Sequence, residues 1–282
     1  MIENNAPLQQ IPERNAFVLA RRGPVVYVEA RGPLWPAYAA HGFCTRHAGV
    51  SGGPYASLNV GDRVGDDLDC VRENIHIIKD TFGIAEAPLF LPRQVHGNRI
   101  VEISGDEDPL SLPSCDGLLT DRPGIALGIK TADCVPILFA DRGRAVVGAA
   151  HAGWRGTVLG IAARMVGRMV NRYGSGKQDI VALIGPAVGA CCYEVDAPVF
   201  EAFSGVMDMD TVSRRLPDGR HWLIDLKRAN ALQLTAAGIP ADNILVADFC
   251  TACRNDLFYS HRAAGGKAEG RQLNVVALSP TS

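Results

Sequence analysis

Short apolar runs recur along the whole chain, and they constrain its fold more than any other feature. Each run is rich in Val, Ile and Leu and is bounded by Gly, Pro or Asp, which is the pattern of β-strands separated by turns. Nine runs of this kind lie at residues 25–29, 89–91, 99–103, 125–130, 135–140, 145–150, 180–184, 244–247 and 273–278. We therefore expect a protein built mainly on β-sheet.

Only three segments carry apolar residues at helical spacing, and each is followed by a glycine. They span residues 69–82, 156–173 and 225–237. Many strands with few long helices favour an α+β fold over a regular doubly wound sheet. No linker divides the chain, so we expect residues 15–282 to form a single domain of layered mixed sheets flanked by helices. Residues 1–14 are expected to be a disordered leader.

The composition is that of an ordinary globular protein, and it excludes several classes of function. Of the 282 residues, 47% are hydrophobic and 21% are charged, and the net charge is −2. Without a basic block, a nucleic acid is a poor partner. No apolar run approaches the ~20 residues of a membrane span. Since the N-terminus lacks the apolar core of a signal peptide, reduced cysteines and a cytoplasmic location are expected.

Three residues at the edges of apolar runs have the chemistry of a zinc site. His96 is followed by a glycine, Cys134 precedes a strand, and His151 lies in the motif Ala-His-Ala-Gly-Trp-Arg-Gly at 150–156. Two imidazoles and one thiolate match what zinc prefers, and three protein ligands leave a fourth position for water, as in catalytic sites. Taken singly, each residue also fits a buried, hydrogen-bonded His or an inert Cys. Cys134 beside a histidine also fits a thiol nucleophile, so both mechanisms stay open.

Arginines in tightly turned segments are candidates for binding an anion. Arg46 lies in the glycine-rich loop 43–54, for which an ordinary surface loop is the alternative. Arg155 lies where a strand ends and a helix opens, and backbone N–H groups at such a point favour phosphate or carboxylate. A helix cap with a solvated arginine is the alternative there. Arg262 lies in the motif Phe-Tyr-Ser-His-Arg at 258–262 and is a candidate for lining the same pocket.

The segment 250–253 is a lone Cys-x-x-Cys motif. A structural zinc would need a second pair of cysteines, and the adjacent Cys191 and Cys192 are a poor pair. The sequence therefore favours cysteines that pack near the site, without a disulfide.

Eight short motifs carry a family resemblance. In order they are 94–97 (Gln-Val-His-Gly), 116–117 (Asp-Gly), 131–136 (Thr-Ala-Asp-Cys-Val-Pro), 150–156, 184–186 (Ile-Gly-Pro), 250–253, 258–262 and 270–272 (Gly-Arg-Gln). Over roughly residues 40–278 the chain resembles the YfiH-type laccase-domain family. Its members have been described as multicopper polyphenol oxidoreductases, purine nucleoside phosphorylases and peptidoglycan-editing factors. The resemblance implies an α+β fold similar to that of a bacterial deamidating toxin domain.

The resemblance also implies one zinc ion, held by His96, Cys134 and His151, and purine nucleoside chemistry. The implied reactions are phosphorolysis of adenosine, inosine and S-methyl-5′-thioadenosine to free base and ribose 1-phosphate or its methylthio form, together with deamination of adenosine. Purine nucleosides and phosphate are then the small-molecule partners.

Roles for individual residues follow from these reactions. Cys134, His151 and Asp133 are the catalytic candidates, with Asp133 orienting a water molecule or moving protons. Substrate or phosphate would be bound by three arginines, Arg46, Arg155 and Arg262.

Copper is expected less than zinc, because the seven histidines include no His-x-His pair of the kind that a multicopper cluster suggests. The alternatives are a Cys134–His151 amidase acting on a peptidoglycan precursor, a polyphenol oxidase, and a metal-binding scaffold without chemistry of its own.

Overall fold

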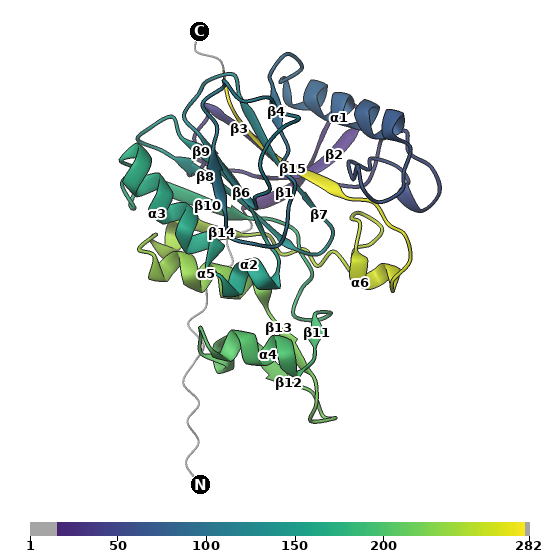
Figure 1. The fold of residues 1–282 in the computed structure, drawn as a ribbon, viewed down its shortest axis with the longest axis vertical. Helices are drawn as coiled ribbons and strands as arrows, with labels where there is room; N and C mark the ends of the chain where they lie inside the picture. Colours follow the sequence, from purple (N-terminus) through teal and green to yellow (C-terminus); the bar gives the residue numbers. More distant parts are fainter. Residues whose placement is uncertain (1–15, 280–282) are drawn as a thin grey trace.

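The computed structural model describes residues 16–279, and within them two six-stranded sheets pack face to face (Figure 1). The first sheet has the order β1 (Phe17–Arg22), β2 (Val25–Ala30), β3 (Ala39–Cys44), β15 (Gln272–Leu278), β7 (Ala126–Thr131) and β4 (Leu89–Phe90). The second has the order β14 (Ile244–Val246), β10 (Ile180–Ile184), β8 (Val135–Asp141), β9 (Val147–Ala152), β6 (Gly117–Thr120) and β5 (Ile100–Glu102). The leader expected at 1–14 lies outside the described residues.

Alternation along the central strands explains why the sheets stack. In β8, Val135, Ile137 and Phe139 face one apolar cluster, whereas Leu138 and Ala140 face another. Successive side chains of a strand point to opposite faces, so a strand that is apolar throughout must be covered on both sides. One face of β8 therefore packs on the first sheet and the other packs on helices.

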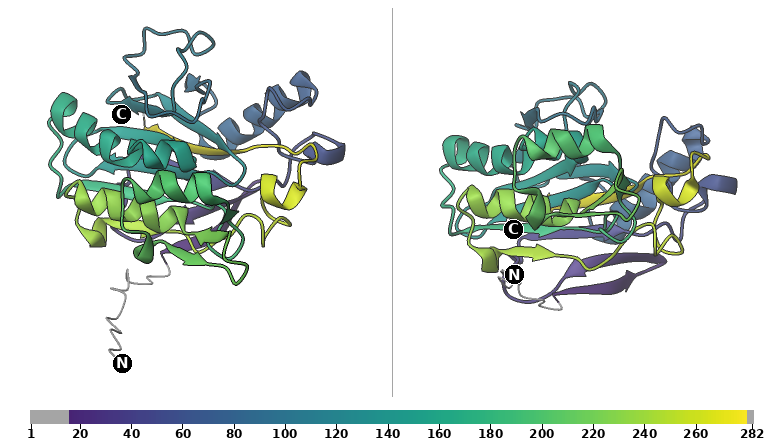
Figure 2. Two further views of the ribbon diagram at one scale, coloured as in Figure 1. Left: turned by 60° about the horizontal axis from the view of Figure 1, so that its bottom comes forward. Right: turned by 90° about the horizontal axis from the view of Figure 1, so that it is seen from below.

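Helices cover the outer face of each sheet. α2 (Trp154–Val158), α3 (Ile161–Tyr173) and α5 (Leu226–Ala236) lie together over the second sheet, and α1 (Leu68–Phe82) packs against the first (Figure 2). The buried face of α3 includes Met165 and Met169, and that of α1 includes Ile78 and Phe82. The result is a four-layer arrangement with three apolar cores.

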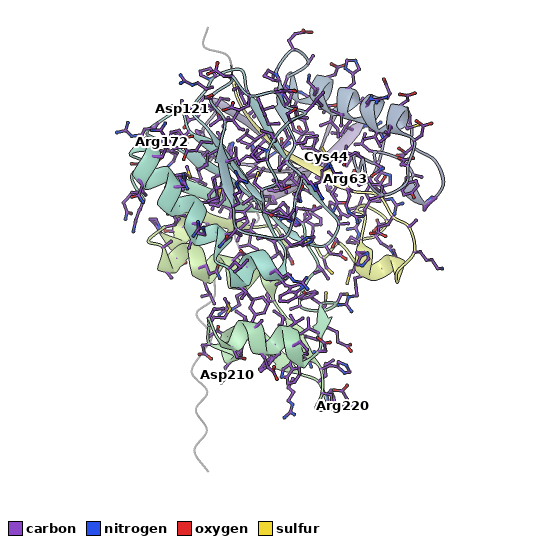
Figure 3. The ribbon with its side chains drawn as sticks, viewed as in Figure 1. Cys44, Arg63, Asp121, Arg172, Asp210 and Arg220 are labelled. Atoms are coloured by element: carbon purple, nitrogen blue, oxygen red, sulfur yellow. The ribbon has the colours of Figure 1, made fainter. Side chains whose placement is uncertain are left out.

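A smaller unit projects from one end of these layers (Figure 1). It consists of α4 (Ala197–Ser204) and a three-stranded sheet with the order β11 (Glu194–Val195), β13 (Trp222–Ile224) and β12 (Ser213–Arg215). Asp210 and Arg220, labelled in Figure 3, lie in this projection. A short helix, α6 (His261–Ala264), lies on the side of the molecule nearer α1.

The α+β architecture expected from the sequence is confirmed, and all nine expected strands form with bounds shifted by a few residues. The single helix expected at 156–173 is wrong, because α2 begins earlier, at Trp154, and ends before Gly160, which adopts left-handed backbone with φ of 72° and starts α3 anew. Several strands were not expected, among them β3, β6 and β1; β1 opens with four apolar residues but is an edge strand that ends in two exposed arginines. No helix in the described part of the chain is long and apolar enough to cross a bilayer.

The break at Gly160 generates a stability prediction. Gly160→Ala should lower the free energy of unfolding by about 1–2 kcal/mol, because left-handed backbone is strained for any residue with a Cβ. Gly167→Ala is the matched control: this glycine lies within α3, where an added Cβ meets no atom within 4 Å. Removing a glycine from a helix interior should stabilise it by roughly 0.5–1 kcal/mol. Urea unfolding measures the free energy of unfolding of both variants. A change of the same sign in Gly160→Ala and Gly167→Ala would contradict this explanation.

Candidate active site

Antiparallel pairing of β8 with β9 brings Cys134 and His151 together. Cys134 directly precedes β8, and His151 pairs with Pro136 in the register of the two strands. His96 comes from the loop before β5, which is an edge strand of the same sheet. One ligand atom from each of the three residues lies within 4.8 Å of the others. The structure thus brings the three together, as a shared metal site requires.

The Asp116 carboxylate holds two of these residues in place. It is fully buried, and Oδ1 lies 2.8 Å from Nδ1 of His151. It also accepts hydrogen bonds from the backbone N–H groups of residues 95, 96 and 97, at 3.2, 2.9 and 2.7 Å. These bonds fix the turn in which His96 has left-handed backbone with φ of 58°. Burial alone would raise the pKa of Asp116, but the bonds from His151 and Gly97 outweigh it and lower the pKa.

The position of Asp116 also selects the ring nitrogen that His151 presents. Because Nδ1 is bonded to the carboxylate, Nε2 is left for a ligand. The rings of His96 and His151 meet edge to face, with centroids 4.8 Å apart.

Cys134 and His151 stabilise each other's charged forms. Burial opposes both charges, but the neighbouring imidazoles of His151 and His96 lower the pKa of Cys134 to about 6. In the same way burial is outweighed at His151, whose pKa the Cys134 thiolate and Asp116 raise to about 9. The two shifts act in the same sense, so this pair favours a thiolate at Cys134 beside a protonated imidazole at His151. A thiolate is the form that both a metal and an electrophile require.

Gly153 leaves the space in which the ligand atoms meet. A Cβ at this position would lie 2.9 Å from Cδ2 of His96 and 3.0 Å from Sγ of Cys134. The glycine therefore permits close approach of the backbone to the three side chains.

The donor set fits one zinc ion. Two imidazole nitrogens and one thiolate are preferred zinc ligands, and three of them leave a position for another molecule. The hydrogen bond from His151 to a buried carboxylate is the outer contact that such ligands usually make. His96, Cys134 and His151 are thus the residues that could hold the ion.

The site opens into a cleft of about 1620 Å³. Its charged lining is strongly basic: eight cationic side chains face two carboxylates. The cations are Arg63, Arg72, Lys79, Arg93, Lys130, Arg155, Arg262 and Arg271, and the carboxylates are Asp62 and Asp133. Arg63, labelled in Figure 3, appears in that view between α1 and α6. A cleft of this charge favours an anionic ligand.

Two of the three predicted arginines line this cleft. Arg155 stacks over Trp154, with its guanidinium carbon 4.1 Å from the ring centroid, and Arg262 donates to the carbonyl of Glu194 at 2.6 Å. Arg46 is not among the residues that line the cleft. Its guanidinium donates to the carbonyls of Ala56 and Asn255 and stacks on Tyr259. These contacts favour a structural role for Arg46.

Asp133 lines the cleft next to Cys134, on left-handed backbone with φ of 86°. Oδ1 accepts a hydrogen bond of 2.6 Å from the Thr251 hydroxyl, and Oδ2 accepts one of 2.6 Å from the backbone N–H of Arg262. Both oxygens are thus engaged by neighbouring loops. This arrangement favours a role in positioning Cys134 over transfer of protons.

Asp116 and Gly153 were not predicted as site residues. Both lie inside motifs that carried the family resemblance, at 116–117 and 150–156, so position within a motif was the available signal. The contacts themselves depend on pairing of β6 with β9, which places Gly117 opposite Ala150. A linear sequence does not specify that register.

Comparisons with known proteins agree with this architecture. A family model described as multi-copper polyphenol oxidoreductase laccase matches residues 40–279. A purine nucleoside phosphorylase, YlmD of Geobacillus stearothermophilus, is 40% identical over 248 residues, covering 85% of this chain and 90% of the relative. An adenosine deaminase, RL5 of an unknown prokaryotic organism, is 36% identical over 232 residues, covering 79% and 88%.

A solved structure matches as well. The crystal structure of the Bacillus licheniformis hypothetical protein YfiH has a TM-score of 0.86 at 35% identity, covering 94% of this chain and 100% of that one. This chain therefore belongs to the laccase-like family that includes YfiH. The family resemblance of the motifs is confirmed, and the two relatives with named activities are enzymes.

Gly153→Ala should weaken zinc binding at the three-residue site. The added Cβ must displace the His96 ring or the Cys134 sulfur, and metal–ligand bonds of about 2.0–2.3 Å tolerate little displacement. The zinc concentration that protects Cys134 from alkylation, followed by mass spectrometry, should rise about 10–100-fold. Gly52→Ala is the control, because an added Cβ there meets no atom within 4 Å. Unchanged protection in Gly153→Ala would show that the ligands do not converge at this glycine.

Proposed function

We propose that this protein is a zinc-dependent purine nucleoside enzyme. In this proposal it cleaves adenosine, inosine and S-methyl-5′-thioadenosine with phosphate, releasing the base and ribose 1-phosphate or its methylthio form, and it also deaminates adenosine. The observation that carries the proposal is the His96–Cys134–His151 site at the wall of a basic cleft. Relatives named as a purine nucleoside phosphorylase and an adenosine deaminase support it.

The cleft offers surfaces for both parts of a nucleoside reaction. Trp154 and Tyr193 line it with half-buried aromatic rings that suit a purine. Among the described residues, no carbonyl or carboxylate accepts a hydrogen bond from the guanidinium of Arg155. Its donors are therefore available to phosphate.

Different residues have different roles in the two proposed reactions. When bound, zinc would supply Lewis acidity and a lower pKa for a water molecule beside the purine. Asp116 would keep His151 oriented through Nδ1, and Asp133 would keep Cys134 in place. Arg155 and Arg262 would hold phosphate against the sugar, where negative charge must be neutralised as the base departs.

A multicopper oxidase is not favoured by the distribution of histidines. In the described residues, His41 contacts Trp35, His76 pairs with Asp80, and His221 pairs with Asp218. His47 and His261 belong to neither of the two groups of possible metal ligands found within residues 16–279. One site with two histidines suits a single metal ion and does not suit a copper cluster.

A thiol amidase acting on a peptidoglycan precursor is the second candidate. It is favoured by one observation, the lowered pKa of the Cys134 thiol beside His151. The same pair would activate a nucleophile if no metal were bound. Chelation separates the two candidates, because it should abolish zinc-dependent turnover and leave a thiol hydrolase active.

The direct test is release of hypoxanthine from inosine by purified protein. Release should require phosphate and should stop when zinc is removed. In Arg155→Ala, loss of a hydrogen bond to a charged group costs about 1.5–3 kcal/mol. Phosphate-dependent cleavage should therefore fall about 10–100-fold, and adenosine deamination should fall less, since it uses no phosphate.

Arg164→Ala serves as the control for that experiment, because Arg164 is an exposed residue of α3 that does not line the cleft. Equal losses of both activities in Arg155→Ala would assign Arg155 to nucleoside binding. Absence of phosphate-dependent release in the wild-type protein, with zinc bound, would overturn the proposed function.

A further inference from the structure

Four cysteines far apart in the sequence converge beside the cleft. Cys191 and Cys192 come from one loop, and Cys250 and Cys253 from another, and all four sulfur atoms lie within 4.8 Å of one another. Sγ of Cys253 is 3.5 Å from that of Cys191 and 3.3 Å from that of Cys192. All four are free thiols. Cys191 and Cys192 therefore supply the second pair of ligands for the Cys-x-x-Cys motif, because the fold brings the two pairs together.

The topology of the second sheet explains the convergence. β10 and β14 are parallel neighbours, so the loops after their carboxyl ends start at the same edge. A bridge between Ala187 and Cys250 continues the pairing into the loops, and Thr251 donates its backbone N–H to the carbonyl of Ala187 at 3.0 Å. The two cysteine pairs are thus held face to face by backbone hydrogen bonds.

We propose that Cys191, Cys192, Cys250 and Cys253 form a second metal site, a tetrathiolate that binds one zinc ion. Zn–S bonds of about 2.3 Å in a tetrahedron place the sulfurs ~3.8 Å apart. The observed separations are close to this spacing. Four protein ligands leave no position for substrate, so the site is structural.

The surroundings match those of a bound tetrathiolate. Both cysteine pairs lie in tight turns, closed by Tyr193 N–H to the Gly189 carbonyl at 2.9 Å and by Arg254 N–H to the Cys250 carbonyl at 2.9 Å. The N–H of Gly189 donates to Sγ of Cys250 at 3.2 Å, a bond that stabilises negative charge on sulfur. The largely buried ammonium of Lys227 donates to the carbonyl of Phe249 at 3.4 Å, which places a positive charge beside this loop.

The two loops form part of the wall of the cleft. Tyr193, directly after Cys192, lines it, and Thr251, between the other two cysteines, holds the carboxylate of Asp133. The N–H of Val188 donates to the Asp133 carbonyl at 2.9 Å. Metal binding to the four cysteines would therefore fix the residues that position Cys134. This inference does not rest on the substrates proposed above.

Zinc content of the full-length protein tests the proposal. After saturation with zinc and gel filtration, the wild-type protein should retain two zinc ions per chain, whereas Cys253→Ser and Cys134→Ala should each retain one. With Co²⁺ in place of zinc, the spectrum of a tetrahedral tetrathiolate should persist in Cys134→Ala and vanish in Cys253→Ser. Cys70→Ser, on α1 and in neither group of possible metal ligands, should behave as wild type.

Cys191→Ser provides a second variant at an exposed position, in case Cys253→Ser does not fold. The proposal is overturned if Cys134→Ala retains no metal while remaining folded. It is also overturned if thiol titration of the denatured, unreduced wild-type protein finds two of these cysteines lost to a disulfide. Failure of the proposed nucleoside activity would change none of these metal contents, so the two ideas fail separately.

Discussion

The buried carboxylate of Asp116 is the group on which the site depends. An ionised carboxylate inside a protein is costly unless it is fully hydrogen-bonded, and here three backbone N–H groups and one imidazole meet that requirement. The same bonds fix the left-handed backbone of His96, and they leave Nε2 as the nitrogen that His151 can present beside Cys134. One buried charge therefore positions two of the three residues that are proposed to bind zinc.

Much of the fold could be predicted from apolar periodicity, because strands covered on both faces must be apolar throughout, as β8 is. Exceptions arise where local backbone geometry decides. Gly160 breaks an otherwise continuous helical pattern, and edge strand β1 combines four apolar residues with two exposed arginines. The spacing of apolar residues indicates which face of an element is buried, but it does not indicate where the backbone adopts a left-handed conformation.

Site residues could be predicted where their side-chain chemistry is distinctive. Contacts that depend on the register of paired strands could not be predicted from the sequence. His96, Cys134 and His151 were recognisable as metal-ligand types, and strand pairing then brought them together. Adjacent Cys191 and Cys192 are a poor ligand pair by sequence, and only the parallel pairing of β10 with β14 brings them to the Cys-x-x-Cys motif. Arg46 had the right charge, but nearby carbonyls occupy its donors.

The central claim is that Asp116 organises a zinc site used in turnover, and Asp116→Asn tests it most directly. The Asp116 carboxylate has two acceptor oxygens, whereas an asparagine side chain has one oxygen and an NH₂ group that only donates. Asparagine therefore cannot accept hydrogen bonds from the imidazole and from all three N–H groups. Phosphate-dependent hypoxanthine release at limiting zinc should fall about 10–100-fold, with partial recovery at excess zinc. Asp121→Asn, at an exposed position, is the control. Wild-type turnover by Asp116→Asn at limiting zinc would contradict the claim.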